Sequence, residues 1–249
     1  MDTIRKSGQG VFNIIRFNWH FYVVAILVIL ILIGFASFLS GWGSTLLLIL
    51  VFLIFLSTFI SLAASWWVYD LSNLYTFDWL NLPTAPNRIV NINAGFDETS
   101  QLLKKKYPSA ELLVLDFYDP DIHTEVSIHR ARKAYPPYPG TQPVTSVNLP
   151  LLPQSTDYIF LCLSAHEIRD DAERQQFFGL LKKALLPNGK IVLIEHLRDL
   201  PNFLAYNIGF FHFHSLNTWK TTFAAAQLDI FQQEKITPFL NVFYLAPKN

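Results

Sequence analysis

Four side chains that could exchange protons lie in two short polar segments, each at the end of an apolar run. His166 and Glu167 follow the first run, and Glu195 and His196 close the second. An imidazole beside a carboxylate is suited to taking a proton from a hydroxyl or an amine. Each of the four could also belong to a capped helix or a satisfied turn. Because they crowd two points of the chain, we predict that they are catalytic.

The two apolar runs and the segment between them form a βαβ unit. Residues 157–163 and 190–194 are short and continuously apolar, like strands buried on both faces. Between them, 172–186 carries apolar side chains at helical spacing, and Pro187-Asn188-Gly189 ends that helix. In open parallel sheets, ligands bind at the edge where such strands end. The four polar residues are therefore expected at a binding edge.

The surrounding sequence continues this alternation of strands and helices. The last two predicted strands are joined by a link too short for a parallel crossover, so they form an antiparallel hairpin. The sequence thus predicts an α/β fold of the Rossmann-like kind, with a seven-stranded, mostly parallel sheet that ends in this hairpin. The remaining strands are predicted at 88–92, 111–115, 144–147, 228–235 and 240–246, and the remaining helices at 99–107, 121–134, 200–211 and 216–227.

This order of elements resembles that of class I S-adenosylmethionine-dependent methyltransferases. The shared features are a turn with one glycine after the first strand, an acid after the second, the segment Leu185-Leu-Pro-Asn-Gly-Lys190 before the fifth, and the final hairpin. The resemblance covers residues 87–249. It implies that the loop 91–98 surrounds the methionine part of S-adenosylmethionine and that Asp116 holds the ribose hydroxyls. The residues expected to bind the cofactor are Asn93, Gly95, Asp97, Glu98 and Asp116.

The first loop departs from the family pattern, which has three glycines at alternate positions. Here only Gly95 is present, with Asn93 before it and Asp97 after it. Asn93 could keep the turn, because asparagine tolerates a positive φ. Asp97 either caps the next helix or, like Glu98, faces the positive charge of the cofactor. A carboxylate here would repel the pyrophosphate of NAD, which disfavours a dinucleotide. A domain that has lost the cofactor, with Asp116 as a turn former, is the alternative.

Two histidines at alternate positions, His212 and His214, form a further polar group. On a strand they would point the same way. With His166, His196 or Glu195 they could build a metal site, but no cysteine supports this spacing, and we predict no metal. The residues expected to line a substrate pocket are Arg198, Asn202, His212 and His214.

The N-terminal part has the composition of a membrane anchor. No Asp, Glu, Lys or Arg occurs from Phe17 to Tyr69. Segments 19–39 and 45–69 are each long enough to cross a hydrocarbon core of roughly 30 Å. A cleaved signal peptide would have a shorter apolar region and no second span, and a single span or a buried apolar hairpin is the other alternative. We predict two transmembrane helices.

Basic residues flank both ends of this predicted hairpin. Arg5, Lys6 and Arg16 precede the first span, and Arg88 and the run 104–106 follow the second. Because cytoplasmic flanks carry the excess of Lys and Arg, both termini and the α/β domain are expected on the cytoplasmic side. The chain divides into an anchor (1–69), a juxtamembrane linker (70–86) and a methyltransferase-like domain (87–249).

Charge and anchoring narrow the function further. The net charge is zero and no basic stripe occurs, so nucleic acid is not expected as a partner. Cys162 is the only cysteine, which rules out internal disulfides. A tether to the lipid bilayer raises the local concentration of the domain there, which benefits an enzyme with a lipophilic acceptor. We predict a membrane-anchored S-adenosylmethionine-dependent methyltransferase acting on a small lipophilic molecule. The alternative is a catalytically silent methyltransferase-like module that acts as a membrane assembly platform.

Overall fold

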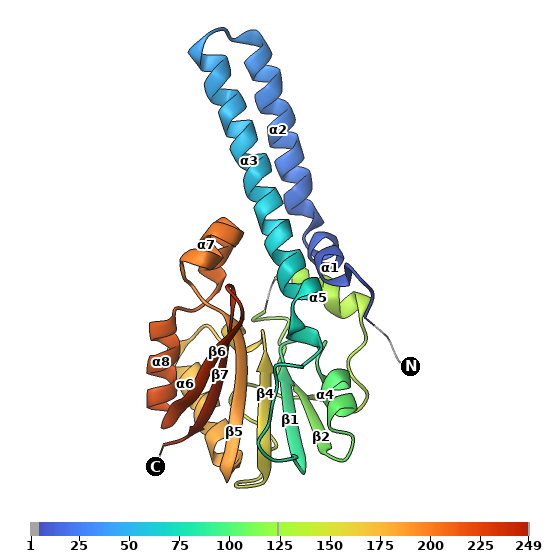
Figure 1. The fold of residues 1–249 in the computed structure, drawn as a ribbon, viewed down its shortest axis with the longest axis vertical. Coiled ribbons are helices and arrows are strands. Elements are labelled where there is room, and N and C mark those ends of the chain that lie inside the picture. Colours follow the sequence, from blue (N-terminus) through green and yellow to red (C-terminus); the bar gives the residue numbers. More distant parts are fainter. Residues whose placement is uncertain (1–4, 124, 249) are drawn as a thin grey trace.

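A twisted central sheet forms the core of the α/β domain in the computed structural model, which describes residues 5–123 and 125–248 (Figure 1). The strand order is β3-β2-β1-β4-β5-β7-β6. Strands β1 to β5 run parallel to one another, and β7 is antiparallel to both β5 and β6, which confirms the predicted fold class. The strands are β1 (Arg88–Asn93), β2 (Glu111–Asp116), β3 (Gln142–Pro143), β4 (Thr156–Cys162), β5 (Leu185–His196), β6 (Leu228–Thr237) and β7 (Leu240–Pro247).

Each face of the sheet buries its own apolar core. Along β5, Ile191 and Leu193 join the core beneath α6 (Asp171–Ala184) and α8 (Leu216–Ala225). Val192 and Ile194 point the other way, into the core beneath α4 (Ser100–Lys106). The central strands are continuously apolar because successive side chains enter opposite cores.

Four predicted elements differ from the structure. Strand β5 begins at Leu185, five residues earlier than predicted, so Pro187-Asn188-Gly189 lies within the strand and does not end the helix. The third strand is β3, two residues earlier than expected at 144–147, and it is short because Pro143 has no N–H for the ladder. Helix α5 (Val126–Ala134) begins five residues later than predicted. The predicted helix 200–211 ends early, because Asn207 takes a positive φ of 50°; it comprises α7 (Leu200–Tyr206) and the 3₁₀ helix η4 (Asn207–His212).

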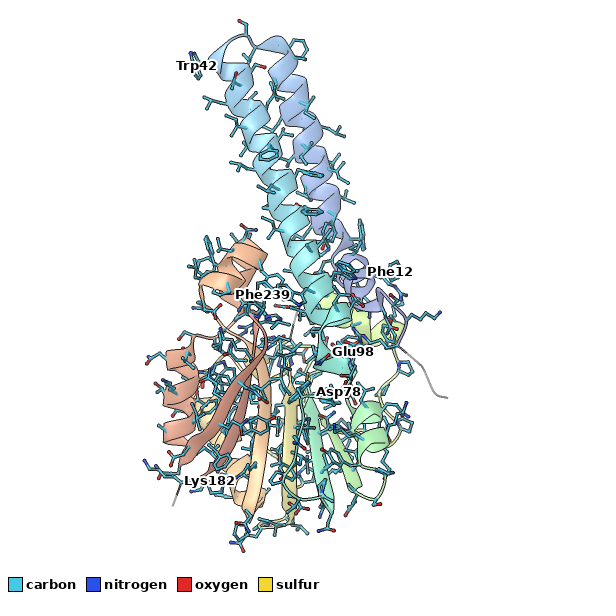
Figure 2. All side chains as sticks on the ribbon, viewed as in Figure 1. Phe12, Trp42, Asp78, Glu98, Lys182 and Phe239 are labelled. Carbon is cyan, nitrogen blue, oxygen red and sulfur yellow. The ribbon has the colours of Figure 1, made fainter. Side chains whose placement is uncertain are left out.

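A helical hairpin projects from the sheet and is built from α2 (Trp19–Phe38) and α3 (Trp42–Trp66) (Figure 1). Both helices are long and apolar enough to cross a membrane. Within these fully described helices only Ala36, Ala64 and Ser65 are buried. Figure 2 shows the side chains of both helices pointing outward along the hairpin. A helix that is apolar all round and packs in no core is typical of a membrane span.

The hairpin is joined closely to the domain. Helix α3 continues into a π-helical turn, η1 (Trp67–Leu71), and a 3₁₀ turn, η2 (Asn73–Tyr75). Leu74, Phe77 and Leu80 are buried in the same core as β1 and β5. The stretch 70–86, which we expected to be a linker, therefore contributes to the core of the domain.

The short helix α1 (Gln9–Phe17) lies across the base of the hairpin, beside α5 (Figure 1). The carboxylate of Asp70 accepts the backbone N–H groups of Gly10 at 2.7 Å and Val11 at 2.8 Å. On its other side, the Tyr135 hydroxyl donates to Asn13 Oδ1 at 2.9 Å, and Arg130 donates to the carbonyl of Phe17. These bonds fix α1 over the carboxyl ends of the strands.

Candidate functional site

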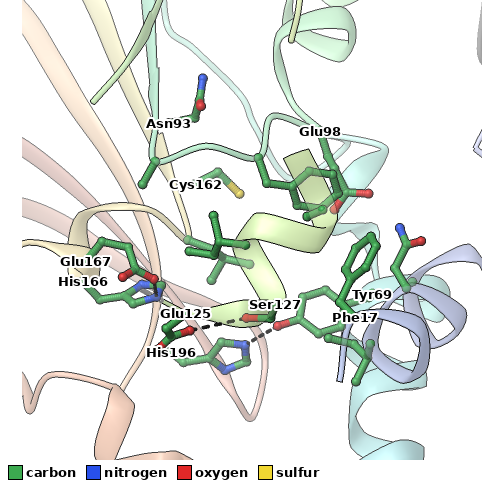
Figure 3. A pocket seen from close by; sticks show the side chains of 18 of the residues that line it. Phe17, Tyr69, Asn93, Glu98, Glu125, Ser127, Cys162, His166, Glu167 and His196 are labelled. Atoms are coloured by element: carbon green, nitrogen blue, oxygen red, sulfur yellow. Dashed lines mark hydrogen bonds and ion pairs between the residues drawn. The ribbon is translucent and has the colours of Figure 1, made fainter. Parts of the chain in front are cut away.

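A cavity of about 290 Å³ lies at the carboxyl edge of the sheet, between the strand ends and the base of the hairpin (Figure 3). The sheet side is formed by residues at the ends of β1, β4 and β5, and the opposite side by α1, α5 and the turns after α3. Of the predicted site residues, those that line it are Asn93, Glu98, His166, Glu167, His196 and His212.

The end of β4 turns sharply into the cavity. Leu163 takes a positive φ of 52°, an uncommon conformation for a residue with a side chain. The Ser164 hydroxyl fixes the turn by donating to the carbonyl of Ile92 at 3.0 Å. The following 3₁₀ turn, η3 (Ala165–Glu167), places His166 and Glu167 in the cavity wall.

His166 is held by Glu195 from the neighbouring strand. Its Nδ1 lies 2.6 Å from Glu195 Oε2, and its backbone N–H donates to Oε1 of the same carboxylate at 3.2 Å. Glu195 is fully buried, and it does not line the cavity itself. Burial alone would lower the pKa of His166, but the carboxylates of Glu195 and Glu167 outweigh it and raise that pKa to about 10.

His196 has the opposite environment. Its Nδ1 lies 3.0 Å from Asn202 Oδ1 and 3.1 Å from the Phe239 carbonyl, and both partners are acceptors, so this nitrogen carries the proton. Its Nε2 is then an acceptor and receives the Tyr69 hydroxyl at 3.0 Å (Figure 3). Burial lowers the pKa of His196 to about 4, so the imidazole is neutral at physiological pH.

His212 completes a cluster with two carboxylates. Its Nδ1 lies 2.8 Å from Glu125 Oε1, and its Nε2 lies 3.4 Å from Glu167 Oε1. Burial would lower the pKa of His212, but Glu125 and Glu167 raise it. Glu167 is buried too, yet hydrogen bonds from His166 and His212 bring its pKa well below the ordinary value.

The loop after β1 keeps its turn differently from the prediction. Asn93 does not adopt a positive φ; its Oδ1 instead accepts the Gly95 N–H at 3.1 Å, and Gly95 itself has a φ of 97°. Asp97 Oδ1 accepts the backbone N–H groups of Thr99 and Ser100, both at 2.9 Å, so the carboxylate caps the start of α4. Neither Gly95 nor Asp97 lines the cavity.

The two remaining carboxylates predicted to face a cofactor are already paired. Glu98 accepts the Arg5 guanidinium at 2.5 Å and the Tyr75 hydroxyl at 2.7 Å. Asp116 ends β2 as expected, and its Oδ2 accepts Arg132 NH1 from α5 at 2.5 Å. The Arg132 side chain is 37% exposed, and it also donates to the Gly95 carbonyl at 3.3 Å and lies over the Tyr118 ring.

Three residues expected in a substrate pocket do not line the cavity. Arg198 donates to the carbonyls of Phe213 and Phe211 and so fixes the loop that carries His212. Asn202 is fully buried behind His196. His214 points away from His212, because the segment is not a strand, and its Nε2 contacts the buried Arg174 at 3.2 Å.

Sequence reasoning missed the wall that the N-terminal helices provide. Arg5, Asn13, Phe17 and Tyr69 line the cavity, although they lie in or beside the segments read as membrane anchor. Glu125 was also missed, because the helix α5 was expected to begin before it. Long-range hydrogen bonds place all of these residues, and no local pattern in the sequence reveals such bonds.

No protein-family model matches this chain, and no curated protein matches it in sequence. Solved structures with similar folds include human N-acetylserotonin methyltransferase in complex with S-adenosylmethionine (15% identity, TM-score 0.53, 78% of this chain and 56% of that one). A Pyrococcus horikoshii OT3 protein is also similar (15% identity, TM-score 0.52, 70% of this chain and 88% of that one). So is an O-methyltransferase family 2 protein from Planctomyces limnophilus DSM 3776 in complex with apigenin (13% identity, TM-score 0.50, 76% and 61%).

The chain spans little more than half of the human enzyme, and identities this low compare folds and not activities. The strand order, the antiparallel final hairpin and these structural neighbours agree with one another. The protein therefore has the α/β fold of S-adenosylmethionine-dependent methyltransferases, preceded by two long apolar helices.

Proposed function

We propose that this protein is a membrane-anchored methyltransferase that uses S-adenosylmethionine to methylate a hydroxyl group of a small lipophilic acceptor. The observation that carries the proposal is the cavity, which joins the ligand-binding edge of this fold to the base of the apolar hairpin. His196, whose imidazole is neutral, lines the same cavity. The positive flanks of the hairpin favour a cytoplasmic position for the cavity.

The residues present fit the cofactor. Asn93 and Glu98 line the side of the cavity next to β1, where the methionine part would be held, and Asp116 follows β2, where the ribose would be held. Asn13 is 5% exposed, and its Nδ2 has no hydrogen-bond partner among the described residues, so a donor is left for a ligand. Arg132 must release Asp116, and its exposure permits this.

The histidine geometry supports proton removal from the acceptor. When bound, S-adenosylmethionine supplies an electrophilic methyl group on a sulfonium. His196 presents Nε2 as an acceptor, because Asn202 and Phe239 hold the proton on Nδ1. The acceptor hydroxyl would give its proton to this nitrogen, either directly in place of Tyr69 or through the Tyr69 hydroxyl.

The walls of the cavity favour an apolar acceptor. Ile14, Phe17, Phe96, Leu163 and Phe213 line it and would exclude water from the reacting atoms. Next to the hairpin, α7 and η4 expose a group of large apolar side chains that would rest in the membrane interface. These side chains are Leu200, Phe203, Leu204, Ile208 and Phe211.

Cofactor binding is the first test. Calorimetric titration of the detergent-solubilised protein with S-adenosylmethionine, and separately with NADH, should show saturable binding of the first alone. Asp116→Asn should weaken it, whereas Asp121→Asn, an exposed acid in the same loop, should not. If the wild type does not bind S-adenosylmethionine, the proposed methyltransferase function is refuted. This result would favour the silent assembly module, whose physical basis is the pairing of Glu98 and Asp116 with arginines.

Anchoring needs a test that preserves the cavity. Deleting the first 70 residues would remove part of its wall, so the outward apolar side chains of α2 and α3 should instead be replaced by polar ones, with residues 5–18 and 67–75 intact. The variant should lose flotation with liposomes and its activity on a long-chain phenol in vesicles, while keeping its activity on a short-chain phenol. Equal losses on both phenols would contradict the role of the anchor.

A further inference from the structure

Two histidines and a glutamate meet at one wall of the cavity. His166 and Glu167 come from the turn after β4, and His212 comes from the end of η4. One nitrogen or oxygen atom from each lies within 4.8 Å of the others. Glu167 Oε1 sits between the rings, 3.4 Å from His166 Nε2 and 3.4 Å from His212 Nε2.

Each histidine has a second carboxylate behind its other ring nitrogen. Glu195 lies 2.6 Å from Nδ1 of His166, and Glu125 lies 2.8 Å from Nδ1 of His212. Carboxylates in this position hold the proton on Nδ1 and orient the Nε2 lone pair of a metal-binding histidine. Without an ion, both Nε2–H groups donate to the shared Glu167 oxygen; an ion at this place would displace the two protons and take both Nε2 atoms as ligands.

The spacing and charge of these groups suit a divalent cation. Two donors about 2.1 Å from an ion at a tetrahedral angle are about 3.4 Å apart, the separation seen on both sides of Glu167. Once the ion has displaced the Nε2 protons, the two imidazoles are neutral, and Glu125, Glu167 and Glu195 bring three negative charges. One guanidinium, from Arg169, contacts the His212 ring. A doubly charged ion would balance the cluster.

We propose that His166, Glu167 and His212 bind a divalent transition-metal cation of the Zn²⁺ or Co²⁺ type, with Glu195 and Glu125 orienting the two histidines. Imidazole and carboxylate donors without a thiolate favour such ions. All three ligands line the cavity, so the remaining coordination positions open into it. Arg169 is exposed, and its guanidinium, which also donates to the His212 carbonyl, would have to leave the His212 ring for the ion to enter.

The consequence for the reaction rests on the proposed function. An ion at this wall would bind the acceptor oxygen and lower the pKa of its hydroxyl, which eases proton transfer to His196. Binding of the ion itself depends only on the three side chains. It is therefore measured without cofactor or acceptor.

The test is uptake of Co²⁺ by the full-length, detergent-solubilised protein after treatment with a chelator. Wild type should take up one ion per chain, with the visible absorption bands of a low-symmetry Co²⁺ site. His212→Ala removes a partly exposed ligand, so the fold should tolerate it, and uptake should be lost. Glu125→Gln should weaken binding about 10- to 100-fold. His129→Ala, an exposed histidine on α5, should change nothing.

Absence of stoichiometric uptake by the wild type would overturn the proposal, and so would unchanged uptake by both His212→Ala and Glu167→Gln. Arg169→Gln tests whether the guanidinium itself occupies the place of the ion. If only this variant binds Co²⁺, the guanidinium fills that place permanently and the metal assignment is wrong. Co²⁺ uptake by a protein that fails to bind S-adenosylmethionine would refute the proposed function alone. The metal site would then still stand.

Discussion

Acidification should lower the unfolding free energy of this protein, because the folded state buries His196 in its neutral form. His196→Gln should remove this part of the pH dependence. His196 is 3% exposed, and its neutral form is held by acceptors on Nδ1 and by the Tyr69 hydroxyl on Nε2. Above pH 6.5 the folded and unfolded states both carry a neutral ring, so the group contributes no pH dependence. Below pH 6.5 the unfolded chain takes up a proton, whereas the folded protein does so only near pH 4. The stability contributed by His196 therefore falls as the pH falls through this window.

The size of the effect follows from the two pKa values. A tenfold difference in proton affinity corresponds to about 1.4 kcal/mol. The difference between the pKa of 6.5 in the unfolded chain and about 4 in the folded protein therefore changes the unfolding free energy by about 3 kcal/mol, and most of this change is complete at pH 4.5. His196→Gln keeps a donor and an acceptor but does not titrate. Relative to wild type, this variant should gain about 2.5 kcal/mol of unfolding free energy between pH 7.5 and pH 4.5.

Denaturant titrations in detergent at the two pH values, followed by tryptophan fluorescence and far-UV circular dichroism, would measure this difference. Carboxylates elsewhere also titrate over this range, but they cancel in the comparison of wild type with variant. His129→Gln, at an exposed position, controls for loss of any histidine. A stability difference between wild type and His196→Gln that stays constant with pH would refute the assignment of a buried, neutral His196.

Three further predictions follow from other contacts. Arg132→Met should free Asp116 and tighten S-adenosylmethionine binding about two- to fivefold, since a partly exposed ion pair is worth up to about 1 kcal/mol; calorimetry that shows weaker binding would contradict this. Gly95→Ala should cost about 2 kcal/mol or more, because a Cβ at φ 97° would approach the Tyr118 ring to 2.9 Å, and thermal unfolding should show a lower Tm. Asp70→Ala should release the start of α1 at a cost of about 1–2 kcal/mol, seen as faster proteolysis near Val11; Asp78→Ala, an exposed acid, should leave the cleavage rate unchanged.

The sheet could be predicted from the sequence because its signals are local. Strands buried on both faces are continuously apolar, as residues 157–163 are. The expected helix stop at Pro187-Asn188-Gly189 was wrong, because α6 ends at Ala184 and these residues lie within β5. The order of such elements was enough for the fold class. The start of α5 and the position of β3 were wrong, because a proline-rich segment between them carries no periodic pattern.

The site was only partly accessible from the sequence. Residues at or just beyond the end of a strand, such as His196 and His166, are placed by the topology of the sheet, so the prediction brought them to the correct edge. His214 was misplaced because alternation along an assumed strand does not apply after a 3₁₀ turn. The pairing of Glu98 with Arg5 spans 93 residues and depends on tertiary packing alone.

The attachment of α1 has a consequence for biosynthesis. This helix is made early, yet its hydrogen-bonding partners Asp70, Arg130 and Tyr135 follow 60 to 122 residues later in the chain. Contacts so distant in sequence form slowly, and during translation they must wait until α5 has left the ribosome. The hairpin would thus settle before the cavity acquires its second wall, and closure of the site would be a late step in the maturation of the newly made protein.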